Sequence, residues 1–430
     1  MTCNFIRIQK ILKNKIIISI LFSIFSSCFL FGCVPSIVKN NQNNQTDSII
    51  LPTMRNDQLK SPTFNLKRFP DQVALLLPLS GTYKREGESI LNGFLSAHYS
   101  LNKDNQGIKN INVYDTQKYN NIEEAYDLAV QEGAKFIVGP LLQESVKELS
   151  GKIAFSTPVL SLNSIDNDNP IIGMYQFSLS SIDEVISTSN KVISDQNKYG
   201  VIIMPNNELG YQLKEIYTNT FQSMGGLIID HQAYDPENQD FSEELKELLS
   251  ISNSEKRYRR LSANLNEYLA YNPRRRQDID FIFLLATDTT NAKLLKSQLN
   301  YHLSGDKPIP VYSTSNIFSF NTDLNDLDGI IFTDAPWVID QQTWLADLPS
   351  ILRKYWPGDA IQSRQNAMGY DAYFLVSELN TIKSNNFQEL NGATGQLYMT
   401  NNGKIRRRLA WAKLVNGTLQ IHEENNVIEQ

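Results

Sequence analysis

Cysteine is almost absent from this chain of 430 residues, because all three cysteines lie within the first 33 positions. No disulfide framework and no cysteine-based metal site can therefore form in the rest of the chain. The four histidines show no metal-ligand spacing and are too sparse to suggest a Ser–His–Asp set. Gly-x-Gly, the P-loop and the Gly-x-Ser-x-Gly elbow are also missing. The sequence predicts a protein that is not an enzyme and holds no cofactor or metal.

The net charge of −6 argues against nucleic acid as a partner. Residues 255–276 depart from this balance, with seven basic and two acidic side chains. The segment falls between a predicted helix and strand, where a βα fold needs only a short loop. Two interpretations stay open: a solvated helical hairpin, or a face that docks on an acidic partner patch or cell-wall carboxylates. The candidate docking residues, which we expect at a rim, are Arg257, Arg259, Arg260, Arg274, Arg275 and Arg276. A second basic cluster, 404–408, is expected on a strand edge.

The N-terminus has the pattern of an export signal. Four basic residues precede an uncharged apolar run of about 16 residues, which is short for a membrane-spanning helix. The run ends in "LFGC", and Leu30, Gly32 and Cys33 resemble the lipobox of bacterial lipoproteins. A thiolate is the nucleophile suited to alkylation by diacylglycerol. We expect cleavage after residue 32 and lipid attachment, including palmitate, at Cys33. A plain secretory signal and attachment at Cys28 remain alternatives.

Residues 33–70 are expected to be the lipidated N-terminus and a disordered linker, because Asn, Gln, Ser and Pro dominate without periodicity. Lipoprotein sorting, as the lipobox resemblance implies, retains proteins with Asp after the cysteine in the inner membrane. Val34 stands there. The resemblance therefore implies an outer-membrane anchor with the body facing the periplasm.

From Val73 onward, apolar runs suited to buried parallel strands alternate with helical patterns. Two such series predict an α/β fold of two doubly wound, Rossmann-like lobes joined by crossover segments. We place lobe 1 at 71–180 and 336–388, and lobe 2 at 181–335 and 389–425. The stretch "GYDA" (369–372) is predicted to be either the start of a helix that packs in the lobe or a contact in the cleft. Asn402–Gly403 predicts a hairpin turn.

The body resembles the type I periplasmic-binding-protein fold, and more narrowly the C-terminal domain of the LppC/LpoA lipoproteins. The matching stretches run from about 71 to 415 and include "VALLLPLSG", "GAKFIVGPLL", "PVLSLN", "MYQFSLS", "DLDGIIFTDAPW" and "TGQLYMTNNGKIRRRLAWA". The resemblance implies an outer-membrane lipoprotein that binds and activates a class A penicillin-binding protein, and so regulates peptidoglycan synthesis and cell shape. Peptidoglycan itself is a second candidate contact. Better-known members also carry a helical-repeat domain before the lobes, where we expect only the linker here.

Between the lobes we expect a cleft, and its candidate residues are Ser80, Gly81, Ser161, Asn163 and Asp334. In amino-acid receptors of this fold, hydroxyl groups bind the ligand's carboxylate and an acid binds its ammonium group. Here Leu141 and Leu142 follow "GP", and "SLNS" is no clear carboxylate cradle. Reuse of the fold as a scaffold is therefore favoured over small-ligand capture. The alternatives are a solute-binding receptor lipoprotein of an importer and a non-catalytic envelope scaffold.

Overall fold

The computed structural model describes residues 69–101, 107–152, 155–167, 169–304, 307–320, 322–339, 347–357, 363–384 and 389–422. The expected signal peptide, Cys33 and nearly all of the expected linker lie outside these ranges. Within them, no helix combines the length and the apolar character that crossing a bilayer requires.

The first sheet has eight strands in the order β11-β12-β13-β5-β4-β3-β1-β2. Its strands are β1 (Gln72–Leu77), β2 (Asn110–Asp115), β3 (Phe136–Val138), β4 (Val159–Ser161), β5 (Met174–Phe177), β11 (Leu390–Asn391), β12 (Gln396–Met399) and β13 (Lys404–Arg408). The strands from β13 to β2 pair in parallel, whereas β11, β12 and β13 pair antiparallel. The helices of this lobe are α2 (Lys84–Leu101), α3 (Ile122–Gln131), α4 (Gln143–Ser150), α11 (Asp347–Tyr355) and α12 (Arg364–Ser384).

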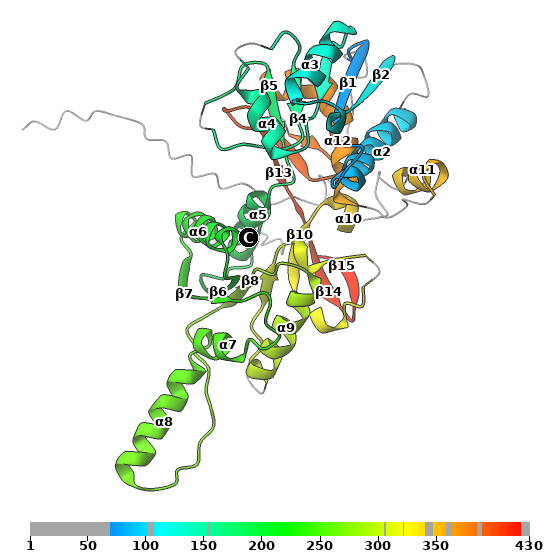
Figure 1. Cartoon of the computed structure of the whole chain (residues 1–430). Helices are drawn as coiled ribbons and strands as arrows, with labels where there is room; N and C mark the ends of the chain where they lie inside the picture. The colour runs from blue at the N-terminus through cyan, green and yellow to red at the C-terminus, as the bar shows by residue number, and fades with distance from the viewer. Residues whose placement is uncertain are drawn as a thin grey trace, which may run out of the picture. The chain divides into compact units, whose positions relative to one another are not determined.

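The second sheet has seven strands in the order β15-β14-β10-β9-β8-β6-β7. Its strands are β6 (Tyr199–Pro205), β7 (Leu227–Tyr234), β8 (Phe281–Leu284), β9 (Val311–Ser313), β10 (Ile331–Asp334), β14 (Ala410–Val415) and β15 (Thr418–Ile421). The helices in this part of the chain are α5 (Ser181–Ser194), α6 (Glu208–Ser223), α7 (Ser242–Leu248), α8 (Ile251–Leu265), α9 (Thr289–Leu303) and the short α10 (Pro336–Ile339). Both sheets and their helices can be followed in Figure 1.

The expected fold class is confirmed, since each lobe is built on a largely parallel sheet with helices packed against it. The burial of β1 on both faces explains why its sequence is a continuous apolar run. Val73, Leu75 and Leu77 pack in one buried cluster, while Ala74 and Leu76 pack in another on the opposite face. A strand covered by helices on both faces needs apolar residues at every position.

The C-terminal lobe boundary needs correction. We expected residues 389–425 in lobe 2, but β11, β12 and β13 complete the first sheet, with β13 beside β5. The chain reaches the second sheet only with β14, which pairs antiparallel with β10. The expected hairpin turn at Asn402–Gly403 is confirmed between β12 and β13, where Gly403 has a φ of +78°.

Helices α2 and α12 approach each other at two glycines. A Cβ on Gly93 would lie 1.9 Å from the carbonyl oxygen of Asn366, and one on Gly369 would lie 2.0 Å from that of Ile90. Both positions therefore require a residue without a side chain. "GYDA" lies inside α12 and not at its start, and Gly369 supports the packing interpretation of this motif.

Candidate functional site

A cleft of about 580 Å³ lies between elements of the two lobes. Helices α2, α4 and α12 contribute from the first lobe, and α5 and α6 from the second. Representative lining residues are Tyr83, Glu86, Leu142, Asn163, Asp166, Ser178, Ser181, Gln212 and Met368. Glu86 and Asp166 are the charged members of the described lining, which includes no Lys, Arg, His or Cys. The described lining therefore offers no thiol nucleophile and no imidazole base.

The polar side chains that we expected in this cleft are mostly engaged within the protein. Asn163 lines it, but its Nδ2 donates to the carbonyl of Leu141 and its Oδ1 accepts from the backbone N–H of Ser164. Ser161 is fully buried and donates to the carbonyls of Asn163 and Tyr175. The side chains of Asn163 and Ser161 therefore stabilise the loop, and a ligand could bind them only by breaking these hydrogen bonds.

Ser80 and Gly81 form a tight turn outside the described lining of the cleft. The Ser80 hydroxyl donates to Asp115 at 2.8 Å, and the backbone N–H of Leu79 donates to the same carboxylate at 2.9 Å. Burial acts to raise the pKa of Asp115, but these hydrogen bonds outweigh it and lower the pKa below its usual value. Gly81 has a φ of +74°, which favours glycine. The turn interpretation of this loop therefore accounts for both residues.

Asp334 is also not a lining residue of the cleft, because it is 1% exposed and bound to Arg364. Arg364 stands at the start of α12, so the ion pair connects a strand of the second sheet to a helix of the first lobe. The role we expected for Asp334 in the cleft is therefore corrected to a structural one.

A second buried ion cluster was missed by sequence reasoning. Asp183 in the first turn of α5 lies 2.6 Å from Nε of Arg406 and 3.4 Å from Nε of Arg407, both on β13. Burial raises the pKa of Asp183, while the two guanidinium groups oppose that rise. β13 lies between β12 and β5, so the expected strand-edge position of 404–408 is wrong. Partners more than 220 residues apart in sequence leave no local signal.

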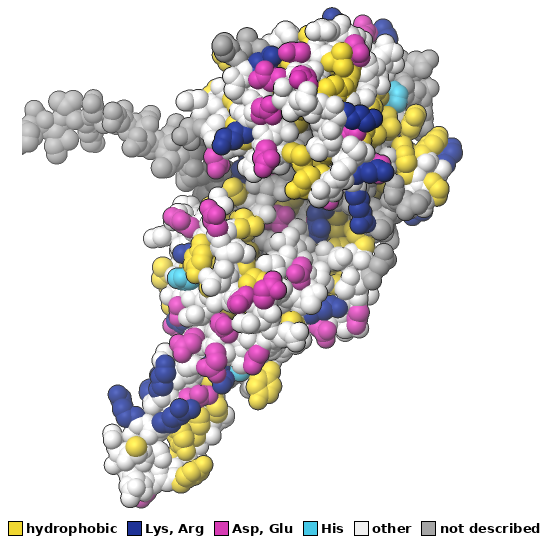
Figure 2. All heavy atoms as spheres, in the orientation of Figure 1, with side chains coloured by type: hydrophobic (Ala, Val, Ile, Leu, Met, Phe, Trp, Pro, Cys, Tyr) yellow, Lys and Arg dark blue, Asp and Glu magenta, His cyan; other side chains and the backbone are white. Residues whose placement is uncertain are grey.

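The basic segment forms α8 and an irregular return segment. Arg257, Arg259 and Arg260 are exposed on α8, and Arg274 is exposed on the return. The helix and its return run away from the second sheet in Figure 1. Figure 2 shows Lys and Arg side chains along one edge of this projection and hydrophobic side chains along the other.

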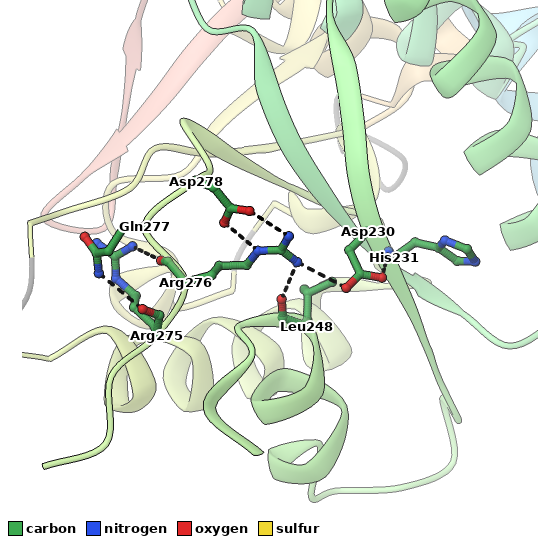
Figure 3. A network of polar contacts seen from close by, with 7 residues as sticks. All are labelled: Asp230, His231, Leu248, Arg275, Arg276, Gln277 and Asp278. Atoms are coloured by element: carbon green, nitrogen blue, oxygen red, sulfur yellow. Dashed lines mark hydrogen bonds and ion pairs between the residues drawn. The ribbon is translucent and has the colours of Figure 1, made fainter. Parts of the chain in front are cut away.

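Two of the six candidate docking arginines belong to the fold instead. Arg275 is 6% exposed, and its guanidinium donates to the carbonyls of Arg276 and Lys307. The Arg276 guanidinium binds both carboxylate oxygens of Asp278, reaches Asp230 at 3.1 Å and donates to the carbonyl of Leu248 (Figure 3). The expectation that Arg275 and Arg276 lie at a free rim is therefore wrong, because their donors are used within the protein.

Comparison with known proteins identifies the family. The family described as "LppC putative lipoprotein" matches residues 47–417. The chain belongs to the LppC family. Curated relatives include the "Penicillin-binding protein activator LpoA" of Vibrio vulnificus (strain YJ016), 27% identical over 349 residues. The protein of the same name from Vibrio antiquarius (strain Ex25) is 25% identical over 354 residues. Each alignment covers 80% of this chain and 57% of the relative, so the chain spans little more than half of their length.

Solved structures agree on the fold of this LppC family member. The "LpoA (YraM) C-domain from Haemophilus influenzae, a regulator of PBP1A" superposes with a TM-score of 0.63 at 24% identity, over 82% of this chain and 99% of that one. A putative branched-chain amino acid ABC transporter protein from Rhodospirillum rubrum superposes with a TM-score of 0.61 at 15% identity, over 82% of this chain and 99% of that one. The expected type I periplasmic-binding-protein architecture is therefore confirmed.

Proposed function

We propose that this LppC family member is a lipoprotein of the outer membrane that binds and activates a class A penicillin-binding protein. It would thereby regulate peptidoglycan synthesis from the periplasmic side, without catalysis of its own. The observation that carries the proposal is the continuous match of both lobes to relatives named penicillin-binding protein activators. The composition of the cleft is consistent with this role, since its described lining offers no thiol nucleophile and no imidazole base.

Anchoring at Cys33 is part of the same proposal. The charged leader, the apolar run and the "LFGC" sequence support it. The diacylglycerol and a further acyl chain would together hold the protein on the membrane, because one acyl chain alone gives marginal binding. Val34 after the cysteine is the residue that favours the outer membrane under the sorting rule described above.

A second candidate is a solute receptor, and one observation favours it. Oε2 of Glu86 is buried and has no hydrogen-bond partner among the described residues, and Glu86 lines the cleft. A ligand with an amine would satisfy that oxygen. The engaged state of Asn163 and Ser161 speaks against a complete amino-acid cradle, which must also hold a carboxylate. The activator role is therefore the function we propose.

The test is reconstitution with the class A penicillin-binding protein of the same organism. The full-length lipoprotein, in detergent, is added to the synthase and lipid II, and the cross-linked fraction of the product is measured. We expect that fraction to rise with lipoprotein concentration until it saturates. A reaction in which a β-lactam blocks cross-linking gives the background value. No rise at saturating lipoprotein, with a synthase that polymerises normally, would contradict the proposal. A thermal shift with free amino acids but no effect on the synthase would favour the receptor instead.

A further inference from the structure

The second lobe carries a projecting element that its sheet does not need. We call residues 251–276 the arm, which consists of α8 and the return segment that follows it. The chain passes through the arm between α7 and β8. Connections between helices and strands in such folds usually need 2–6 residues. An insertion of this length that remains ordered requires its own stabilising contacts, and the arm has them.

The base and the middle of the arm are held at several points. The backbone N–H of Arg276 donates to the carbonyl of Leu249 at 2.8 Å, which closes the arm where it leaves the lobe. The side chains of Arg275 and Arg276 add the network drawn in Figure 3. Further along, the rings of Tyr258 on α8 and Tyr271 on the return segment stack with centroids 4.3 Å apart. The contacts of Arg275 and Arg276 fix the base of the return segment to the lobe, and the ring stack joins the return segment to α8.

That surface combines positive charge with exposed apolar groups. Arg257, Arg259 and Arg260 lie on α8, and the side chain of Arg259 is 78% exposed. Leu261 and Leu265, one turn apart on the same helix, are 52% and 53% exposed. Tyr268, at the start of the return segment, is 98% exposed. Arginine and tyrosine are enriched among the residues that dominate binding energy at protein interfaces.

We propose that the arm is a docking surface for an acidic, partly apolar patch on the protein partner of this lipoprotein. The inference rests on the proposed function, which supplies the partner, and adds the surface through which that partner is bound. Charge complementarity carries it: the arm is strongly basic in a chain whose net charge is −6. Complementary charge accelerates encounter, and the exposed leucines and tyrosine would slow dissociation once they are covered.

Other occupants fit the same surface less well. A hydrated anionic polymer such as the cell wall would engage the arginines but would leave the leucines in water. A bilayer binds a helix through a wide apolar face, whereas α8 exposes two large apolar side chains, Leu261 and Leu265. A second copy of this chain would have to bind the arm at a different site of its own, and such head-to-tail contacts form rings or open filaments.

The decisive variant reverses three charges of the arm: Arg257→Glu, Arg259→Glu and Arg260→Glu. The matched control reverses three exposed lysines of the first lobe: Lys118→Glu, Lys135→Glu and Lys147→Glu. Both variants change the net charge equally, so a general effect of charge appears in both. Binding kinetics of the full-length lipoproteins to the class A synthase are measured at low salt (about 50 mM) and high salt (about 500 mM). The arm variant should associate about tenfold more slowly at low salt, with a smaller difference at high salt and near-normal kinetics for the control.

A second variant tests the apolar component separately. Leu261→Ser with Leu265→Ser should raise the dissociation rate about tenfold and leave the association rate nearly unchanged. Both side chains are half exposed, so thermal unfolding should stay close to wild type. If the charge reversal impairs folding, Arg257→Gln, Arg259→Gln and Arg260→Gln replaces it with a milder change of the same sign.

The outcomes separate this inference from the proposed function. If the wild-type chain neither binds nor stimulates the synthase, the proposed function fails. If it does both and the arm variants bind like the lobe control, the arm inference is overturned while the function stands. The inference is also overturned if the reversal abolishes binding to phosphatidylglycerol vesicles or self-association of the lipoprotein, and leaves synthase binding intact.

Discussion

The guanidinium of Arg364 donates two hydrogen bonds to the carboxylate of Asp334, at 2.8 Å from Nε and 2.5 Å from Nη2. Arg364 begins α12, which packs against α2 of the first lobe, and Asp334 ends β10 of the second sheet. The same guanidinium also donates to the carbonyls of Ser315 and Phe318. This side chain therefore ties the start of α12 to two segments of the second lobe, β10 and the turn at 315–318.

Replacing Arg364 should destabilise the protein strongly. Arg364→Met leaves the carboxylate of Asp334, which is 1% exposed, without its cation, and such losses cost about 3–5 kcal/mol of unfolding free energy. The double variant Arg364→Met with Asp334→Leu should lose less, because no buried charge remains. Chemical denaturation of the two variants measures both effects. Equal losses in the single and double variants would show that the pair acts through packing alone.

Asp371 should make stability depend on pH. Burial raises its pKa to about 6, although Ala393 and Thr394 donate hydrogen bonds to it. The folded pKa lies above the unfolded value of 3.8, so between these values the folded state keeps a proton that the unfolded chain has lost. Stability from this group therefore falls as pH rises from about 4 to about 6, by about 3 kcal/mol. The unfolding free energy of wild type minus that of Asp371→Asn should decline across this window, and a constant difference would disprove the assignment.

The close approach of α2 and α12 predicts a large effect of one methyl group. Gly369→Ala would place Cβ 2.0 Å from the carbonyl oxygen of Ile90, so the helices must separate, at a cost of about 1–3 kcal/mol. Gly151→Ala is the control, because its Cβ would come no nearer than 3.3 Å to the carbonyl oxygen of Glu148. Thermal unfolding of both variants compares them directly. Equal midpoints would mean that the helices already have room for a side chain at Gly369.

The continuous apolar runs at 73–77 and 199–205 predict the strands β1 and β6 to within one residue, because both strands carry apolar side chains on their two faces. β5, "MYQF", was missed, because Gln176 interrupts the run. Its side chain is 1% exposed, accepts from the backbone N–H of Ile165 and donates to Asn167. In the sequence, a polar residue that is buried and hydrogen-bonded to another loop cannot be distinguished from a polar residue in an exposed turn.

Charged residues were harder to assign because their partners are distant in sequence. Arg407 pairs with Asp183, 224 positions away, and Arg364 with Asp334, 30 positions away. In the sequence alone, a basic cluster such as 404–408 is indistinguishable from a solvated one. The sequence does predict that the arginines of α8 lie on the surface, because three of them fall within four consecutive positions and cannot all be buried with partners.

The lipid anchor is tested by Cys33→Ser. Serine lacks the soft nucleophile needed for the thioether linkage, so the variant should accumulate as an uncleaved precursor or as a soluble periplasmic form. Membrane fractionation and metabolic labelling with palmitate measure the two effects. Cys28→Ser is the matched control and should be acylated normally. Unchanged acylation of the Cys33 variant would move the attachment site to Cys28 or remove the lipoprotein assignment.

Truncating Arg274 and truncating Arg275 should have very different effects on the unfolding free energy. Arg275→Ala removes a buried guanidinium that donates to the carbonyls of Arg276 and Lys307, and the loss of hydrogen bonds from a charged group costs about 1–3 kcal/mol. Arg274 is exposed, so Arg274→Ala should change the unfolding free energy by less than about 0.5 kcal/mol. Chemical denaturation of the two single variants, which remove the same side chain one position apart, compares a buried guanidinium with an exposed one. Equal stability of the two variants would mean that the Arg275 contacts contribute nothing, and the base of the arm would then depend on Arg276 with Asp278 and Asp230.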